Sequence, residues 1–188
     1  MTTPLQDRKI AFLFTEGVEQ AELVEPLRAV QTAGAQTALV SLESGAVQMF
    51  NHLDRGDQIE AEHSVADLEA RDFDGLVLPG GVANPDALRT SSDAVAFIRG
   101  FFDEGKPVGV ICHGPWTLIE ADVVRGRTLT SWPSLKTDLR NAGAEWVDEE
   151  VHVDNGLVSS RNPDDLPAFC EKLVQALATG SRESHPVA

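Results

Sequence analysis

Short runs of apolar residues alternate along this chain with longer amphipathic stretches. The apolar runs have the length of β-strands and lie at residues 9–14, 36–42, 73–79 and 107–111. The amphipathic stretches place apolar residues at helical spacing and lie at residues 19–34, 91–106 and 162–177. Strands without charge on either face, separated by helices, predict a parallel sheet that is covered on both sides. The predicted fold class is therefore α/β, a doubly wound three-layer sandwich with a mostly parallel sheet and helices on both faces.

Local signals add detail to this pattern. Pro26 falls inside the first helix and is expected to kink it or to begin a second helical segment, because proline lacks an N–H group. Turn signals and alternation over residues 43–64 predict antiparallel edge strands. A further helix is expected over residues 114–124, and the "DNG" at 154–156 predicts a hairpin. Asn162 is expected to cap the last helix.

The pattern contains no internal repeat and no linker that would divide the chain. At 188 residues, the chain is long enough to bury a full hydrophobic core. We therefore predict a single domain over residues 1–188, with its folded core at about 9–177. The final stretch, residues 178–188, has nothing to bury and is expected to be a frayed tail.

Acidic residues outnumber basic ones, 30 Asp and Glu against 15 Lys and Arg, which gives a formal net charge of -15 at pH 7. This charge repels nucleic acids and anionic membranes, so neither is expected as a partner. The N-terminus has no apolar signal core, and no run approaches the roughly 18 apolar residues of a membrane-spanning helix. Two cysteines are too few for a disulfide framework. We predict a cytoplasmic protein with reduced thiols.

Chemically versatile residues follow three of the predicted strands. They lie in the segments "FTEGVEQAE" at 14–22, "LPGGVANPD" at 78–86 and "VICHGPW" at 110–116. In open α/β sheets, functional sites form beyond the carboxyl ends of the strands. The three distant segments are therefore predicted to converge on one site.

Cys112 and His113 stand side by side between a predicted strand and a predicted helix. A tight turn there would hold the sulfur out of the sheet, as in the nucleophile turn of hydrolases, and the N–H groups of a helix start favour a thiolate. Cysteine is also among the residue types most often buried in a core, so both interpretations remain open. His113 is either an acid–base partner of the sulfur or a structural histidine.

Glu19 and Glu22 are three positions apart, so both can project from one side of the first helical turn. A protonated carboxyl near Cys112 would stabilise a thiolate, whereas an ionised one would raise the pKa of the thiol. Alternatively, both acids complement the helix dipole. Gly80 and Gly81 allow close backbone approach, and their N–H groups can receive an oxyanion; the alternative is an ordinary turn.

The second cysteine and the other histidines do not form a metal-binding pattern. Cys170 lies on the apolar face of the last predicted helix and is expected in the core. The remaining histidines show no ligand spacing with one another or with a cysteine: His52, His63, His152 and His185. We predict neither a structural metal nor a cofactor.

Together, these motifs closely resemble the PfpI family of the ThiJ/PfpI superfamily. The stretches that carry the resemblance are "EGVEQAEL", "LVLPGG", "GKPVGVICHGPW" and the long segment from "RGRTLTSW" to "NPDDLPAF". The resemblance covers about Lys9 to Leu177. It implies a flavodoxin-like fold in which Cys112 is the nucleophile on a strand-to-helix elbow. It also implies that Glu22 approaches the sulfur, with Glu19 nearby.

The same resemblance implies that His113 is the histidine adjacent to the nucleophile, and that the backbone of Gly81 and His113 donates to an oxyanion. It implies a homodimer or a larger homo-oligomer, in which a neighbouring subunit contributes a glutamate to the histidine. The nearest matching position in this chain is Asp86. Its loop is one residue longer than the family pattern, and aspartate is one methylene shorter than glutamate.

These residues support hypotheses of three classes. The first is a cofactor-independent enzyme of carbonyl stress, of the glyoxalase or deglycase type, acting on a small carbonyl compound or a glycated protein. The second is an intracellular cysteine peptidase, which needs an acid to orient His113 and an accessible peptide groove. The third is a redox-sensing or chaperone-like stress protein without turnover. A glutamine amidotransferase would need a downstream His-x-Glu pair, which the "VHVD" at 151–154 does not supply.

Overall fold

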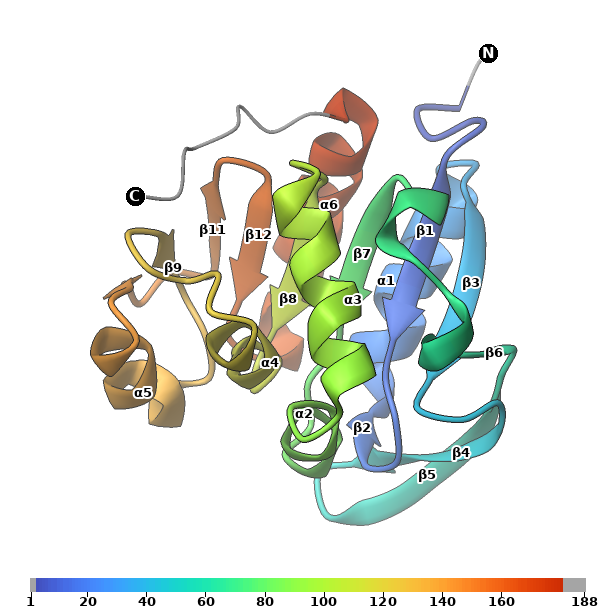
Figure 1. Ribbon diagram of the computed structural model, residues 1–188, viewed down its shortest axis with the longest axis horizontal. Helices are drawn as coiled ribbons and strands as arrows, with labels where there is room; N and C mark the ends of the chain where they lie inside the picture. Colours follow the sequence, from blue (N-terminus) through green and yellow to red (C-terminus); the bar gives the residue numbers. More distant parts are fainter. Residues whose placement is uncertain (1–2, 181–188) are drawn as a thin grey trace.

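A seven-stranded sheet is the centre of the computed structural model, which describes residues 3–180 (Figure 1). The strand order is β11-β12-β8-β7-β1-β3-β6, and all neighbouring pairs are parallel except the antiparallel pair β11 and β12. The strands are β1 (Lys9–Leu13), β3 (Gln36–Ser41), β6 (His63–Ser64), β7 (Gly75–Leu78), β8 (Val108–Ile111), β11 (Val151–Asp154) and β12 (Leu157–Ser160). The prediction of a mostly parallel sheet is confirmed.

Helices cover both faces of this sheet (Figure 1). On one face α1 (Gln20–Thr32) packs beside α6 (Leu166–Thr179), while α3 (Ser92–Asp103) and α4 (Pro115–Glu120) cover the other face. Shorter helical segments lie in the connections: α2 (Ala83–Leu88), α5 (Lys136–Asn141), η1 (Val65–Asp67), η2 (Ala70–Asp72), η3 (Pro133–Leu135) and η4 (Pro163–Asp165). The architecture is the predicted three-layer α/β sandwich.

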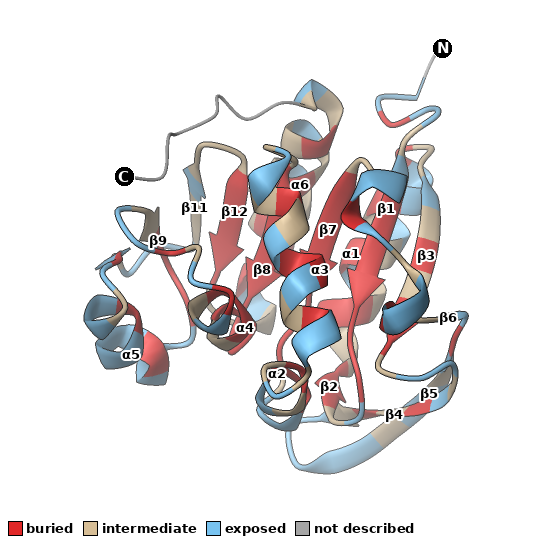
Figure 2. Ribbon diagram, viewed as in Figure 1, coloured by how far each residue is buried: buried red, intermediate tan, exposed pale blue. Residues whose placement is uncertain are grey.

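Strand β1 shows why the central strands read as uninterrupted apolar runs. Ile10 and Phe12 belong to the core beneath α1 and α6, whereas Ala11 and Leu13 belong to the core beneath α3 and α4. Successive side chains of a strand point to opposite faces, and all four of these are fully buried. Figure 2 shows the same burial along β7, β8 and β12. A charge on either face of these strands would lose its hydration without gaining a partner.

The first amphipathic helix is not divided at Pro26. Helix α1 continues from Gln20 to Thr32 with Pro26 inside it. Proline removes one backbone hydrogen bond, but Leu23, Pro26 and Val30 are all buried. In folded proteins such packing supplies most of the stability of a helix. The prediction that a second segment begins at Pro26 is wrong.

The antiparallel strands predicted within residues 43–64 exist, but they do not extend the main sheet. Strands β4 (Gly45–Asn51) and β5 (Asp54–Ala61) form a hairpin, and β4 pairs with β2 (Val18–Glu19) in a separate three-stranded sheet. Because β2 leads directly into α1, the hairpin is held near the carboxyl end of β1 (Figure 1).

The chain after β8 contains a small second unit of secondary structure. Strands β9 (Thr128–Leu129) and β10 (Glu145–Trp146) form a two-stranded parallel sheet beside α5. Helix α4 is shorter than the helix predicted over 114–124, because the backbone enters the left-handed region at Asp122 with a φ of 53°.

The end of the described chain contains the predicted hairpin and cap. Asn155 and Gly156 both have positive φ, 46° and 79°, as a two-residue hairpin turn between β11 and β12 requires. The Asn162 side chain accepts a hydrogen bond from the N–H of Asp164 and begins η4, which leads into α6.

Helix α6 continues to Thr179 and ends at Gly180, whose φ of 69° is the left-handed conformation typical of a helix stop. Residues 178 and 179, which were expected in the tail, are therefore helical, and the rest of the predicted tail at 181–188 lies outside the described residues. No helix within residues 3–180 is long and apolar enough to cross a membrane.

Candidate active site

The three predicted segments meet at the carboxyl edge of the parallel sheet. They follow β1, β7 and β8, which are neighbours in the sheet and point the same way. A cavity of about 430 Å³ opens there. Its lining comes from all three segments, from the β4–β5 turn and from two later loops: Gly17, Glu19, Glu22, Phe50, His52, Leu53, Gly81, Val82, Ala83, Cys112, His113, Trp132 and Pro163.

Cys112 lies on a strained elbow between β8 and α4. Its φ of 62° is in the left-handed region, which non-glycine residues seldom adopt. Two backbone hydrogen bonds hold the peptide in place: the Cys112 N–H donates to the carbonyl of Ser160 at 3.1 Å, and the Trp132 N–H donates to the carbonyl of Cys112 at 2.9 Å. The side chain is 6% exposed and lines the cavity. The turn therefore directs the thiol into the cavity rather than into the sheet.

Glu22 lies beside this thiol and is fully buried in the first turn of α1. Its Oε2 accepts a hydrogen bond from the N–H of Gly80 at 2.9 Å. Its Oε1 has no partner of ordinary hydrogen-bond geometry within residues 3–180. Burial raises the pKa of Glu22 to about 8, and the charge of Glu19 acts in the same direction, while Cys112 and the nearby glycine N–H groups oppose it. At neutral pH the carboxyl is therefore mostly protonated and can donate to the sulfur.

Gly80 and Gly81 permit this close approach. A Cβ on Gly80 would collide with the Glu22 carboxyl and would lie 2.7 Å from the Cβ of Cys112. Gly81 has a φ of 81°, and a Cβ there would collide with the carbonyl of Gly17. The sequence pattern "GG" is therefore required by contact as well as by backbone conformation.

The protonation of Cys112 depends on these neighbours. Burial raises the pKa of the thiol, and an ionised Glu22 raises it further, whereas the N–H groups of Gly81 and His113 lower it. The helix start alone predicted a lowered pKa, but in this buried pocket desolvation outweighs the backbone donors. The thiol must therefore pass its proton to a neighbouring base before or during reaction.

His113 is placed to accept that proton. Its Nδ1 lies 3.1 Å from the Cys112 sulfur, and its Nε2 lies 3.4 Å from Oγ of Ser134. The ring stacks on Trp132, with centroids 5.7 Å apart, and it also contacts Trp116. Burial lowers the pKa of His113, so the ring is neutral at pH 7. Ser134 was not a predicted site residue. It lies 21 positions from His113, in a stretch that contributes to the family resemblance but contains no residue that the sequence analysis assigned to the site.

Glu19 and Asp86, the other two predicted acids, lie in different surroundings. Glu19 is buried, lines the cavity, and accepts a hydrogen bond from the His52 N–H at 3.0 Å through its Oε2. Asp86 is exposed on α2 and does not line the cavity. The structure thus brings Cys112, His113, Glu19, Glu22 and the two glycines together and leaves Asp86 outside. The role of Asp86 in a neighbouring subunit stays a prediction.

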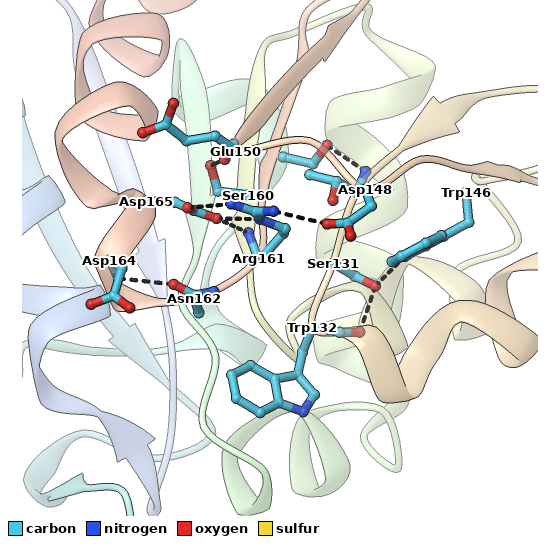
Figure 3. Close-up of polar contacts among 12 residues, drawn as sticks. Ser131, Trp132, Trp146, Asp148, Glu150, Ser160, Arg161, Asn162, Asp164 and Asp165 are labelled. Atoms are coloured by element: carbon cyan, nitrogen blue, oxygen red, sulfur yellow. Dashed lines mark hydrogen bonds and ion pairs between the residues drawn. The ribbon is translucent and has the colours of Figure 1, made fainter.

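A salt-bridge network supports the elbow from the side of β12 (Figure 3). Arg161 follows Ser160, whose carbonyl receives the Cys112 N–H. The Arg161 guanidinium binds Asp165 through two hydrogen bonds of 2.9 Å and binds Asp148 at 2.8 Å. This network fixes the backbone that in turn holds Cys112.

A second set of hydrogen bonds joins Trp146, Ser131 and Trp132 (Figure 3). The indole N–H of Trp146 donates to Oγ of Ser131 at 2.9 Å, and this hydroxyl donates to the carbonyl of Trp132 at 2.9 Å. Trp132 is the residue whose ring stacks on His113 and whose N–H binds the Cys112 carbonyl. Trp132 therefore ties the unit formed by β9, α5 and β10 to the site, in addition to the contact between Ser134 and His113.

The described residues contain no cluster of metal-binding side chains. Within residues 3–180, no group of three or more His, Cys, Asp or Glu side chains could hold a metal ion. Cys170 is half-buried on α6 at the edge of the core, and burial raises the pKa of its thiol to about 11.

Known proteins resemble this chain over most of its length. The profile of the DJ-1/PfpI family matches residues 8–176. A deglycase of Pyrococcus horikoshii is 41% identical over 90% of this chain and 99% of its own length. Protein/nucleic acid deglycase 2 of Escherichia coli is 41% identical over 90% of this chain and 98% of its own. A Bacillus subtilis protein named as a candidate cysteine protease is 40% identical over 86% of this chain and 94% of its own.

Solved structures share the fold. DJ-1beta of Drosophila melanogaster matches with a TM-score of 0.83 and 30% identity, over 91% of this chain and 90% of its own. A two-domain protein of Anabaena variabilis, with DJ-1/ThiJ/PfpI-like and ferritin-like domains, matches with a TM-score of 0.86 and 29% identity. This match covers 97% of the present chain and 52% of that protein, so the present chain spans about half of its length.

Proposed function

This chain belongs to the DJ-1/PfpI family, and we propose that it is a cysteine-dependent enzyme acting on reactive carbonyl compounds in the cytoplasm, of the glyoxalase or deglycase type. The observation that carries the proposal is the contact between the Cys112 thiol and a mostly protonated carboxyl, Glu22, inside a cavity of about 430 Å³. A cavity of this size suits a small electrophile or one modified side chain. The names of the Pyrococcus horikoshii and Escherichia coli relatives give further support.

The first step is addition of the Cys112 sulfur to the aldehyde carbon of a 2-oxoaldehyde. The thiol proton passes to Nδ1 of His113, which lies 3.1 Å from the sulfur on a ring that burial keeps neutral. A C–S bond forms, and the electron pair of the carbonyl moves to oxygen. The N–H groups of Gly81 and His113 stabilise this oxyanion, which then takes the proton from His113 to give a hemithioacetal.

The second step moves a proton between the two carbons of the substrate. A base removes it from the carbon bonded to sulfur, and it is returned to the neighbouring carbon, which gives a thioester of a 2-hydroxy acid. Glu22 and His113 are the groups of the site that exchange protons. Water then cleaves the thioester, releases the 2-hydroxy acid and restores the thiol. The net reaction consumes one water and requires no cofactor.

A glycated protein is a substrate for the same sequence of steps. The early adduct of a 2-oxoaldehyde on a protein nitrogen carries that nitrogen and a hydroxyl on the former aldehyde carbon. The Cys112 sulfur replaces the nitrogen there: the C–S bond forms, the C–N bond breaks, and the nitrogen leaves as an amine with the thiol proton, which gives the same hemithioacetal. The later steps are unchanged, and one water is consumed when the thioester is cleaved. The cavity therefore has to admit only the modified end of a side chain.

Turnover of methylglyoxal to lactate tests this proposal. The variant Cys112→Ser is expected to lose at least about 100-fold in kcat/KM, because a hydroxyl is a much weaker nucleophile than a thiolate. Cys170→Ser is the matched control, since Cys170 lies on α6 and does not line the cavity. Full activity of Cys112→Ser would overturn the proposal.

A cysteine peptidase is the second candidate function. The Cys112–His113 distance of 3.1 Å favours it, as does the name of the Bacillus subtilis relative. A peptidase also needs an acid that orients the histidine, whereas the Nε2 neighbour found within residues 3–180 is the Ser134 hydroxyl. In this alternative, Asp86 of a neighbouring subunit of a homo-oligomer supplies the acid. Cleavage of unfolded casein by the wild type, abolished in both Cys112→Ser and Asp86→Asn, would favour the peptidase.

A redox-sensing role without turnover is the third candidate. Burial raises the pKa of Cys112 in the described pocket, which slows oxidation of a resting thiol. If mild peroxide oxidises Cys112 no faster than Cys170, as mass spectrometry would measure, this role is excluded.

A further inference from the structure

The mouth of the Cys112 cavity carries an apolar rim. Four large apolar side chains are exposed within residues 3–180, and three of them line this cavity: Leu53 at 95% exposure, Val82 at 57% and Trp132 at 37%. They come from the β4–β5 turn, the loop after β7 and the loop before η3. Single exposed apolar residues are common, but three from distant segments around one cavity indicate a surface that contacts a ligand.

The cavity is lined by acidic side chains, Glu19 and Glu22. No lysine or arginine is among its lining residues within 3–180. The titratable groups that face it, apart from Cys112, are Glu19, Glu22, His52 and His113. The Glu19 carboxylate is fixed by the His52 N–H, and its charge acts on the buried Glu22. A carboxylate or phosphate entering this cavity would lose hydration and meet a like charge without meeting a cationic side chain.

We propose that the cavity selects its carbonyl substrate by charge and polarity, with Glu19 as the residue that determines specificity. It accepts neutral 2-oxoaldehydes with an apolar or aromatic substituent, which packs on Leu53, Val82 and Trp132, and it rejects 2-oxoaldehydes that carry a carboxylate. The identity of the substrate class rests on the proposed function, whereas the charge selectivity of the cavity does not.

A matched pair of substrates tests the charge selectivity during turnover. Phenylglyoxal and 4-carboxyphenylglyoxal differ by one carboxylate at the far side of the ring. The wild type is expected to favour phenylglyoxal at least about tenfold in kcat/KM, and Glu19→Gln is expected to reduce this preference to less than about threefold. The amide keeps an oxygen acceptor for the His52 N–H.

Glu60→Gln is the control for the charge. It removes the same charge from an exposed position on β5 that does not line the cavity, so the preference is expected to stay at the wild-type value. Equal turnover of both aldehydes by the wild type, or an unchanged preference in Glu19→Gln, would overturn the role of Glu19.

Alkylation of Cys112 tests the same selectivity without turnover. The sulfur displaces iodide from neutral iodoacetamide or from anionic iodoacetate: a C–S bond forms, the C–I bond breaks, and the thiol proton goes to solvent. The ratio of the two rates, measured by peptide mass spectrometry, is divided by the ratio for N-acetylcysteinamide. The normalised preference for iodoacetamide is expected to be at least about tenfold, and smaller in Glu19→Gln.

The two assays separate the inference from the proposed function. Charge selectivity in alkylation without turnover of any 2-oxoaldehyde would refute the proposed function and leave the selectivity intact. Turnover without charge selectivity in either assay would refute the selectivity and leave the proposed function intact.

The apolar rim has its own test, the ratio of kcat/KM for phenylglyoxal to that for methylglyoxal. Leu53→Ser and Trp132→Ala are each expected to lower the ratio at least about threefold, because the phenyl ring loses an apolar contact. Leu53 is almost fully exposed, so its replacement does not threaten folding. Val153→Ser is the matched control, since Val153 is the fourth exposed apolar residue and does not line the cavity. An unchanged ratio in both rim variants would overturn this part of the inference.

Discussion

Two buried acidic side chains near the Cys112 elbow, Glu22 and Asp165, have contrasting surroundings. Asp165 binds the Arg161 guanidinium with both of its oxygens, and this contact raises the pKa of Arg161 (Figure 3). Within residues 3–180, no cationic side chain contacts Glu22. Its carboxyl accepts a hydrogen bond from the Gly80 N–H and lies against the Cys112 thiol. Both acids are removed from water, but only Asp165 has an opposite charge to compensate for it.

This difference distinguishes an acidic side chain that stabilises the structure from one that can take part in proton transfer. A buried acid that is paired with a cation remains an anion and fixes the backbone around it. A buried acid without a cation keeps its proton, so it can exchange that proton with a neighbouring group near neutral pH. Asp165, which is paired with Arg161, holds the Ser160–Arg161 backbone in place. Glu22, which has no such partner, lies against Cys112 and can exchange its proton.

The largest expected effect follows from removing the exchangeable proton of Glu22. Glu22→Gln keeps an acceptor for the Gly80 N–H but cannot exchange a proton with the substrate. We expect kcat/KM for methylglyoxal to fall about 1,000-fold, within the usual range for loss of an acid–base group. Glu25→Gln, at an exposed position on the same helix, is the control. A loss of less than tenfold would show that Glu22 is not needed as a proton donor.

The second effect is a dependence of stability on pH. The pKa of Glu22 is raised from 4.5 to about 8 in the folded state. Between these two pH values the folded protein retains a proton that the unfolded chain has released. The stability that this provides is complete below pH 4.5 and is lost as the pH rises toward 8. Relative to Glu22→Gln, the free energy of unfolding of the wild type should fall by roughly 3–4 kcal/mol from pH 5 to pH 8. Urea unfolding of both proteins at several pH values measures this, and parallel curves would contradict the raised pKa.

The third effect concerns the paired carboxylate. Asp165→Ala leaves Arg161 without its two-point partner, and we expect the free energy of unfolding to fall by about 2 kcal/mol. The neighbouring Asp164→Ala removes an exposed acid and should change stability by less than about 0.5 kcal/mol. Urea unfolding at pH 7 distinguishes the two variants. Equal stability of the two variants would mean that Asp165 is not a structural anchor.

The smallest effect concerns the hydroxyl behind the histidine. Ser134→Ala removes a contact of 3.4 Å to Nε2 of His113, and we expect about a threefold loss in kcat/KM with a change in the pH profile. Thr137→Ala, exposed on α5, is the control. If Ser134→Ala has wild-type kcat/KM and an unchanged pH profile, the hydroxyl does not orient the ring.

The elements of the fold were predictable where hydrophobic periodicity decides them. Residues 10–13 and 75–78 lie in central strands because their side chains are buried on both faces. Turns and antiparallel edge strands were predicted where the β4–β5 hairpin lies. Their pairing with β2 was not predicted, because a two-residue strand leaves no periodic signal. The predicted start of a second helical segment at Pro26 was wrong for a similar reason. The hydrogen bond that proline removes is visible in the sequence, whereas the packing that compensates for it is not.

The candidate site divides in the same way. Cys112, His113, Glu22 and the two glycines stand in motifs that follow strands, and the fold brings them together. Ser134 and Trp146 reach the site through long-range contacts. Their segment contributes to the family resemblance, but nothing in its local pattern assigns these two residues to the site.

The sequence by itself determined the alternating order of strands and helices and the strand ends at which reactive residues gather, because both follow from local hydrophobic pattern and chain direction. Only the tertiary structure decided which acid keeps a proton. Glu22 and Asp165 are both acidic residues beside helix starts, and their positions in the sequence do not say which of them contacts a cation once it is buried. Their chemistry depends on whether a cation lies beside the buried carboxyl. Arg161, four positions before Asp165, binds it with two hydrogen bonds. Within residues 3–180, the groups that contact the Glu22 carboxyl include the Gly80 N–H and the Cys112 thiol and no cationic side chain.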